Sequence, residues 1–179
     1  MPGAVESEIK LRVGRLDEAR AALARLGAQT VRARHLEDNL LFDDARASLA
    51  AAGCLLRVRR TEKGGVLTYK GPRRDREGVK TRREVETTVG DADALQAIVE
   101  ALGFRRVFRY QKYREVYRWN DVEIVVDETP IGCFLEIEGA LPGIHAAAAA
   151  LGYARADYLR DSYVALFAAA GGRGDMVFA

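Results

Sequence analysis

Hydrophobic and polar positions alternate with a period of two along many short segments of this chain, which is the pattern of β-strands. The clearest segment, 5–13, places Glu6, Glu8, Lys10 and Arg12 on one face and Val5, Ser7, Ile9, Leu11 and Val13 on the other. Further strands are predicted around 40–42 and over 54–61, 66–70, 79–88, 105–119, 122–127 and 133–139. The first strand is therefore charged on a face that an ordinary strand would bury.

Helical signals separate several of these strands. In these segments apolar positions fall on one stripe of a helix. A glycine marks the end of a helix, and a capping aspartate or a proline marks the start. The predicted helices span 16–26, 91–102, 142–151 and 157–170. Residues 45–53 read as a turn or a short helix, and residues 71–78 as a basic, mobile loop.

These elements predict a single domain. About eight short strands, mostly joined as hairpins with helices between them, describe an antiparallel α+β domain. The sequence contains no internal repeat and no sign of a second domain. We therefore expect residues 1–170 to form one domain and the glycine-rich residues 171–179 to form a flexible tail.

The charged face of the first strand recurs along the chain, with Glu-x-Glu pairs on three strands and cations on the strands between them. The sets that share a face are Arg57 and Arg59; Thr68 and Lys70; Lys80, Arg82, Glu84 and Glu86; Lys112 and Arg114; Glu123 and Asp127; and Glu136 and Glu138. One interpretation is the solvent-exposed face of an amphipathic sheet. In the other, about eight strands close into a barrel with the charges inside and the apolar face against helices.

A charged barrel interior would be costly unless it were filled, because buried like charges repel and unpaired ions are expensive to desolvate. A polyphosphate with one or two divalent cations would suit such an interior. Cationic side chains would neutralise phosphate oxygens, and carboxylates would hold hard metal ions. This ligand set favours Mg²⁺ or Mn²⁺ over zinc or copper.

Composition narrows the class of protein further. The 179 residues include 49% hydrophobic and 30% charged positions, as in an ordinary globular protein. The formal net charge of +2 does not by itself indicate a polyanionic partner. Cys54 and Cys133 are too far apart for a zinc motif and predict no disulfide framework. No apolar run is long enough to span a bilayer, and the first residues are not those of a signal peptide. We therefore expect a cytoplasmic protein with no membrane association.

Six motifs in consistent order resemble the CYTH family, the triphosphate tunnel metalloenzymes, which include class IV adenylyl cyclases and thiamine triphosphatases. The resemblance covers about residues 4–168. Its most specific element is Glu-x-Glu-x-Lys, here Glu6, Glu8 and Lys10. The remaining motifs are Leu56-Arg57-Val58-Arg59, Tyr69-Lys70-Gly71, Glu84-Val85-Glu86, Lys112-Tyr113-Arg114, and Val126-Asp127 with the segment 132–139.

The resemblance implies an eight-stranded antiparallel β-barrel, with helices packed outside, that binds a triphosphate and needs Mg²⁺ or Mn²⁺. The implied metal ligands are Glu6, Glu8, Glu136 and Glu138, with Glu84, Glu86 and Asp127 as further candidates. The implied triphosphate-binding cations are Lys10, Arg57, Arg59, Lys70 and Arg114, to which the strand pattern adds Arg82 and Lys112. The catalytic candidates are Glu6, Glu8, Lys10, Glu136 and Glu138.

The sequence departs from the family pattern at two positions. Leu41 stands where many relatives carry tyrosine, and Asp161 stands where relatives often place a basic residue before Ser-Tyr. The second departure leaves open whether the last helix closes the tunnel. Cys54 and Cys133 lack a histidine partner, and His35 and His145 are expected at the surface, so we predict no protein nucleophile.

Two reactions fit the predicted site. Water can attack the terminal phosphorus of ATP, thiamine triphosphate or tripolyphosphate, or the ribose hydroxyl of ATP can attack the α-phosphorus to give cAMP and pyrophosphate. We favour the triphosphatase, with the class IV adenylyl cyclase as the alternative. A non-catalytic polyphosphate or nucleotide sensor is a third hypothesis, against which the four metal acids argue.

Association with other macromolecules is less well defined. Nucleic-acid binding through the Arg73-Arg74-Asp75-Arg76 loop is disfavoured, since acids interleave the cations and aromatic residues do not cluster. The sequence leaves a homodimer open.

Overall fold

The computed structural model describes residues 4–61 and 63–179, and these residues form nine strands and five α-helices. The strands are β1 (Ala4–Val13), β2 (Gln29–Asp43), β3 (Leu55–Thr61), β4 (Gly64–Lys70), β5 (Arg74–Arg76), β6 (Val79–Val89), β7 (Arg105–Trp119), β8 (Val122–Thr129) and β9 (Gly132–Glu138). The helices are α1 (Leu16–Leu26), α2 (Ser48–Ala51), α3 (Ala92–Ala101), α4 (Leu141–Ala150) and α5 (Tyr163–Ala169), with a 3₁₀ turn η1 (Arg155–Asp157).

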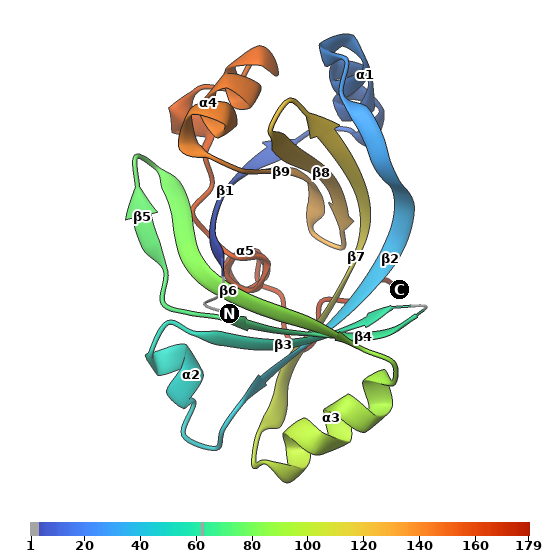
Figure 1. Ribbon diagram of the computed structural model, residues 1–179, viewed down its shortest axis with the longest axis vertical. Coiled ribbons are helices and arrows are strands. Elements are labelled where there is room, and N and C mark those ends of the chain that lie inside the picture. The colour runs from blue at the N-terminus through green and yellow to red at the C-terminus, as the bar shows by residue number, and fades with distance from the viewer. Residues whose placement is uncertain (1–3, 62) are drawn as a thin grey trace.

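Eight of the strands close into an antiparallel barrel. The sheet order is β1-β9-β8-β7-β2-β3-β4-β6-β5, and a further pairing of β1 with β6 closes the ring. The short β5 pairs only with the first residues of β6. Figure 1 looks along this barrel, with helices around its outside and α5 visible within the ring of strands. The predicted α+β class and eight-stranded antiparallel β-barrel are confirmed.

Strand register turns the charged face of β1 inward. Glu8 lies opposite Glu138 and Lys10 lies opposite Glu136 on β9, so these four side chains belong to the same face of the sheet. The alternate residues of β1 and β9, such as Ile9 and Ile137, are almost completely buried on the other face. The barrel therefore has a charged interior and an apolar exterior.

The apolar exterior is covered by helices on two sides. A large hydrophobic cluster joins Ile9, Leu11 and residues of β8 and β9 to Leu23 of α1 and Ile144 of α4. A second cluster places Leu95 and Val99 of α3 against β2 and β3. The side chain of Asp91 accepts hydrogen bonds from the backbone N–H groups of residues 93 and 94, which caps α3 as predicted.

A third apolar cluster lies where α5 meets the barrel. Tyr163 packs there with Leu41, Tyr110, Phe134 and Met176. Met176 belongs to the segment expected to be a flexible tail, but its side chain is completely buried and its backbone pairs with β7. Residues 171–179 thus form part of the packed domain, because the side chain of Met176 is buried against it. The glycine-rich composition of this segment does not indicate that packing.

Three other segments differ from the sequence-based expectation. The last helix, predicted over 157–170, begins only at Tyr163, because Ser162 rather than Asp157 caps it. β2 is fifteen residues long, whereas a short strand around 40–42 was predicted. Irregular pairing with β7 between Thr30 and His35 breaks the two-residue period in its first half. Residues 71–78 include β5 rather than an entirely irregular loop. In the described part of the chain, no helix has the length and apolar character needed to cross a membrane.

Candidate functional site

The barrel encloses a cavity of about 300 Å³. Charged side chains from β1, β3, β4, β6, β7 and β9 make up most of its wall, and α5 contributes to one end. Every predicted site residue except Asp127 lines this cavity. Asp127 is completely buried and forms ion pairs with the lining residues Lys112 and Arg114. The structure therefore brings together residues that lie more than 120 positions apart in the sequence.

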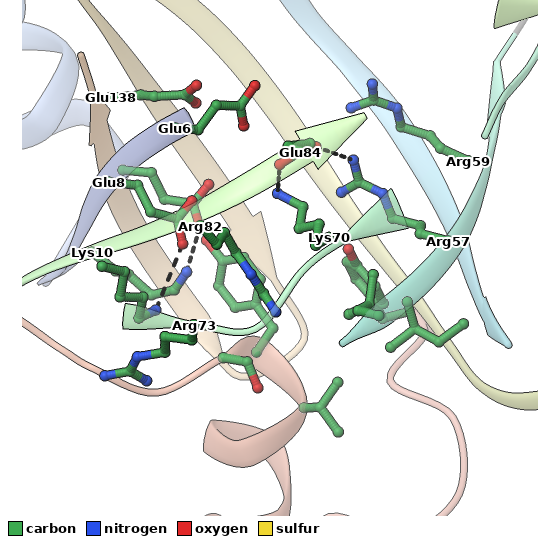
Figure 2. A pocket seen from close by; sticks show the side chains of 18 of the residues that line it. Glu6, Glu8, Lys10, Arg57, Arg59, Lys70, Arg73, Arg82, Glu84 and Glu138 are labelled. Atoms are coloured by element: carbon green, nitrogen blue, oxygen red, sulfur yellow. Dashed lines mark hydrogen bonds and ion pairs between the residues drawn. The ribbon is translucent and has the colours of Figure 1, made fainter. Parts of the chain in front are cut away.

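Glu6, Glu8 and Glu138 lie on one side of the cavity (Figure 2). Burial, followed by contact with Glu84 and the charge of Glu138, raises the pKa of Glu6 to about 8. Burial and the charge of Glu8 raise the pKa of Glu138 to about 7. Burial and the mutual repulsion of neighbouring carboxylates therefore favour the protonated forms of Glu6 and Glu138, whereas Glu8 has Lys80 Nζ 3.7 Å away.

Glu136 has a different environment, although it lies only two residues from Glu138. It forms ion pairs with Lys10 and Arg114. Burial opposes ionisation of Glu136, but these cations outweigh it and hold the pKa of Glu136 well below its ordinary value. Lys10 is only 3% exposed and its pKa is raised by Glu136 and Glu8 in spite of its burial. The main role of Glu136 in this structure is therefore to hold these two cations in place.

Asp127 organises the cations of β7. It accepts hydrogen bonds from Lys112 Nζ at 3.0 Å and from the Arg114 guanidinium at 2.6 and 2.7 Å. The hydroxyl of Tyr163 donates a further hydrogen bond to Asp127 at 2.7 Å. Asp127 has no exposed surface, so its role in this arrangement is to orient Lys112 and Arg114.

A second group of cations occupies the opposite wall, on β3 and β4 (Figure 2). Lys70 Nζ lies 2.5 Å from a Glu84 oxygen, and Arg57 lies 3.9 Å from Glu84 and 3.5 Å from Glu86. Arg59 forms an ion pair at 2.9 Å with Glu37 of β2, which is buried and does not line the cavity. Glu84 and Glu86 therefore sit among cations, where they set the positions of Arg57 and Lys70.

Arg82 lines the cavity, but its guanidinium group binds the protein backbone. It donates hydrogen bonds to the carbonyl oxygen of Gly71 at 2.8 and 3.0 Å and to that of Gly53 at 2.9 Å. These bonds tie β6 to the turns that flank β3 and β4. Arg82 is therefore an anchoring residue here, and less available to a ligand than Arg57 or Lys70.

Six lining residues with polar groups were not among the predicted site residues: Arg73, Lys80, Tyr110, Glu123, Ser162 and Tyr163. Lys80 and Glu123 lie on strand faces that were recognised as charged, so the alternation could have selected them. Lys80 donates to the carbonyl oxygen of Asp161 at 3.2 Å, and Arg73 donates to that of Arg160. Arg73 and Tyr163 reach the cavity from a loop and a helix, which strand alternation cannot predict.

The histidines and cysteines lie apart from the cavity wall. Among the described residues, no cysteine or histidine lines it. His35 and His145 were expected at the surface, but both are partly buried, beside Glu37 and Tyr158 respectively. Cys54 accepts a hydrogen bond from Tyr69 at 3.2 Å outside the cavity.

The donor set of the cavity suits a hard divalent cation. Glu6, Glu8 and Glu138 supply carboxylate oxygens, which Mg²⁺ and Mn²⁺ prefer. A dication would offset the burial and the repulsion that together raise the pKa values of Glu6 and Glu138. Within residues 4–61 and 63–179, no three His, Cys, Asp or Glu side chains converge as a ready-made metal site. The side chains of Glu6, Glu8 and Glu138 would have to change rotamer to hold one ion together.

Comparison with known proteins places the chain in a family. The model of the CYTH domain matches residues 4–163, and the chain belongs to the CYTH family. A protein of Methanocaldococcus jannaschii named as a candidate adenylate cyclase is 30% identical over 142 residues, which are 79% of this chain and 80% of that protein. Adenylate cyclase CyaB of Aeromonas hydrophila is 31% identical over 139 residues, which are 75% of this chain and 69% of that protein.

Solved structures share the fold. A candidate adenylate cyclase from Vibrio parahaemolyticus superposes with a TM-score of 0.81 at 20% identity, over 93% of this chain and 99% of that one. A protein from Hippeastrum, described as a candidate adenylyl cyclase with a dominant triphosphatase activity, superposes with a TM-score of 0.68 at 23% identity. That match covers 94% of this chain and 97% of the Hippeastrum chain.

Proposed function

We propose that this CYTH protein is a triphosphatase that depends on Mg²⁺ or Mn²⁺ and releases phosphate from an organic or inorganic triphosphate. The observation that carries this proposal is the cavity of about 300 Å³ whose wall combines the carboxylates Glu6, Glu8 and Glu138 with lysines and arginines on both sides. A triphosphate with a bound dication has the matching distribution of charge. The reaction and its substrate are the proposed part; membership of the family rests on the match described above.

The cations of the wall would bind and orient the chain of phosphates. Arg57 and Lys70 lie on one side of the cavity and Lys10 lies on the other (Figure 2). Arg114 shares Glu136 with Lys10, and Lys112 shares Asp127 with Arg114. Each is fixed by a carboxylate, so little side-chain entropy would be lost on binding. Preorganised positive charge of this kind stabilises the charge that develops on phosphate oxygens during transfer.

Glu6, Glu8 and Glu138 would hold the metal ion. The bound ion would supply Lewis-acid stabilisation of the phosphate charge. The side chains themselves would set where the ion lies relative to Lys10 and Arg114, and so which phosphate lies beside it. Glu136 would contribute mainly by holding Lys10 and Arg114.

Hydrolysis fits the cavity better than cyclisation does. Cyclisation requires the enzyme to hold a nucleoside so that its ribose hydroxyl meets the α-phosphorus. The uncharged part of the described cavity wall is small, formed by Leu41, Leu55, Tyr110, Ser162, Tyr163 and Val164. The dominant triphosphatase activity of the Hippeastrum protein, which shares the fold, is consistent with this preference.

The alternative is a class IV adenylyl cyclase, and the names of the two relatives near 30% identity favour it. One experiment separates the reactions. Purified protein is incubated with Mg²⁺ or Mn²⁺ and either ATP or tripolyphosphate, and the products are resolved by chromatography. We expect ATP to give ADP and phosphate, and tripolyphosphate to give pyrophosphate and phosphate. Formation of cAMP and pyrophosphate would identify a cyclase, and binding without any product would identify a sensor.

A further inference from the structure

The short helix α5 inserts a single buried side chain into the charged interior of the barrel. Tyr163 is the buried residue of this seven-residue helix and is 7% exposed. Ser162 caps the helix by accepting a hydrogen bond from the N–H of Ala165, which fixes where α5 begins. An ordinary covering helix would bury apolar residues against the outside of a sheet. Tyr163 instead reaches the cavity wall between cations of β1 and β7.

The ring of Tyr163 faces two of these cations. Lys10 Nζ lies 3.8 Å from the ring centroid, and Lys112 Nζ lies 5.3 Å from it. An ammonium group over an aromatic face is attracted to the negative charge of that face, most strongly where water is excluded. Lys10 is therefore held between the carboxylate of Glu136 and the ring of Tyr163.

The hydroxyl of Tyr163 acts on the same group of cations by a second route. It donates to Asp127 at 2.7 Å, and Asp127 in turn accepts from Lys112 and Arg114. Burial, and then the negative charges of Asp127 and Glu136, raise the pKa of Tyr163 well above 10, so the hydroxyl remains a donor at neutral pH. One side chain from the C-terminal segment thus contacts both Lys10 and the carboxylate that orients Lys112 and Arg114.

We propose that Tyr163 is a positioning residue that fixes the Lys10 ammonium group, through its ring, for binding of a phosphate group in the cavity. The proposal rests on the proposed function, because it takes a triphosphate as the ligand. The ring is the larger part of the effect, since Asp127 keeps Lys112 and Arg114 as partners even without the tyrosine hydroxyl.

Two variants and a matched control test this role. Tyr163→Phe keeps the ring and removes the hydroxyl, whereas Tyr163→Leu removes both. Phe167→Leu removes an aromatic ring from the same helix, where Phe167 packs on Phe108 with ring centroids 5.9 Å apart and contributes nothing to the cavity wall. Any loss that comes only from loosening α5 should therefore appear in Phe167→Leu as well.

Binding of inorganic tripolyphosphate in the presence of Mg²⁺ is measured by calorimetry. We expect Tyr163→Leu to raise the dissociation constant about tenfold, Tyr163→Phe about twofold, and Phe167→Leu not at all. Equal losses in Tyr163→Leu and Phe167→Leu, or no loss in Tyr163→Leu, would overturn the proposal. Failure of the wild-type protein to bind tripolyphosphate would overturn the proposed function itself, and that result needs no variant.

A second readout follows Lys10 without any ligand. The chain has five lysines, so their methylene resonances can be resolved in the NMR spectrum of lysine-labelled protein and Lys10 assigned with Lys10→Arg. The Tyr163 ring should shift the Lys10 resonance upfield in the wild type and in Tyr163→Phe. The shift should disappear in Tyr163→Leu and persist in Phe167→Leu; a Lys10 resonance that is the same in all four proteins would contradict the positioning role.

Discussion

At the scale of single residues, the environment of each carboxylate decides its role more than its place in a motif does. Glu136 and Glu138 are two positions apart on β9, yet Glu136 is held by Lys10 and Arg114 whereas the pKa of Glu138 is raised to about 7 by burial and by Glu8. Glu6, Glu8 and Glu138 lie close enough to repel one another, and a dication would offset that repulsion.

Glu8→Gln should therefore abolish turnover of tripolyphosphate, with a loss of about 100-fold or more, because it removes a charge from the proposed metal site. The change conserves shape, so the far-ultraviolet circular dichroism and the melting temperature should stay close to those of the wild type. Glu18→Gln, on the exposed face of α1, is the matched control and should keep full activity. Full activity in Glu8→Gln would remove the metal assignment.

Two of the four arginines expected to bind substrate, Arg57 and Arg82, should also behave differently from each other. Arg57→Ala should weaken tripolyphosphate binding about tenfold, since Arg57 faces the cavity beside Glu84 and Glu86. Arg82→Ala should act mainly on stability, by about 1–3 kcal/mol, because it leaves backbone carbonyl oxygens of Gly71 and Gly53 without their donor. Calorimetry and urea unfolding measure the two effects. A larger loss of affinity in Arg82→Ala than in Arg57→Ala would contradict this division.

At the scale of secondary-structure elements, regular alternation made most strands and the inward-facing residues predictable. Several of the cavity and packing residues that were not predicted lie outside the regularly alternating strands. Tyr163 arrives from a helix, Arg73 from the segment before β5, and Met176 from the chain terminus. The first half of β2 was missed because irregular pairing with β7 disrupts the period of two. Long-range packing, rather than local pattern, determines these positions.

The attachment of α1 to the barrel gives a prediction for pH dependence. Arg20 of α1 donates hydrogen bonds to Glu115 of β7, and Glu115 also accepts one from Tyr117 at 2.8 Å. The hydrogen bonds from Arg20 lower the pKa of Glu115 below its ordinary value of 4.5 in the folded protein. A lowered pKa in the folded state means that ionised Glu115 stabilises the fold above pH 4.5, and that this contribution is lost as the pH falls through the lowered value.

Glu115→Gln should accordingly reduce the free energy of unfolding by about 1 kcal/mol at pH 7, a modest amount because Arg20 is partly exposed. The difference from the wild type should shrink as the pH is lowered below 4.5. Urea unfolding at a series of pH values measures it. A difference that stays constant down to pH 3 would show that the ion pair does not contribute, and that packing alone attaches α1.

At the scale of the whole molecule, the barrel interior contains many charged side chains, whose charge a bound ligand can neutralise. The cavity wall combines the carboxylates Glu6, Glu8 and Glu138 with two groups of cations, and like charges lie close together within these groups (Figure 2). A ligand that binds only the folded protein stabilises it by about 2.7 kcal/mol at 100 times its dissociation constant. For a domain of this size that energy corresponds to a rise in melting temperature of about 5–10 °C.

Tripolyphosphate and Mg²⁺ together should therefore raise the melting temperature by this amount, and each alone should raise it less. Mg²⁺ without tripolyphosphate offsets only the negative charge of Glu6, Glu8 and Glu138. Tripolyphosphate without Mg²⁺ is repelled by the same three carboxylates. Orthophosphate at the same concentration is the control, since one phosphate group cannot span both sets of cations. Equal stabilisation by orthophosphate would mean that anions bind outside the cavity. A joint effect of Mg²⁺ and tripolyphosphate that Glu8→Gln abolishes would place both ligands inside the barrel.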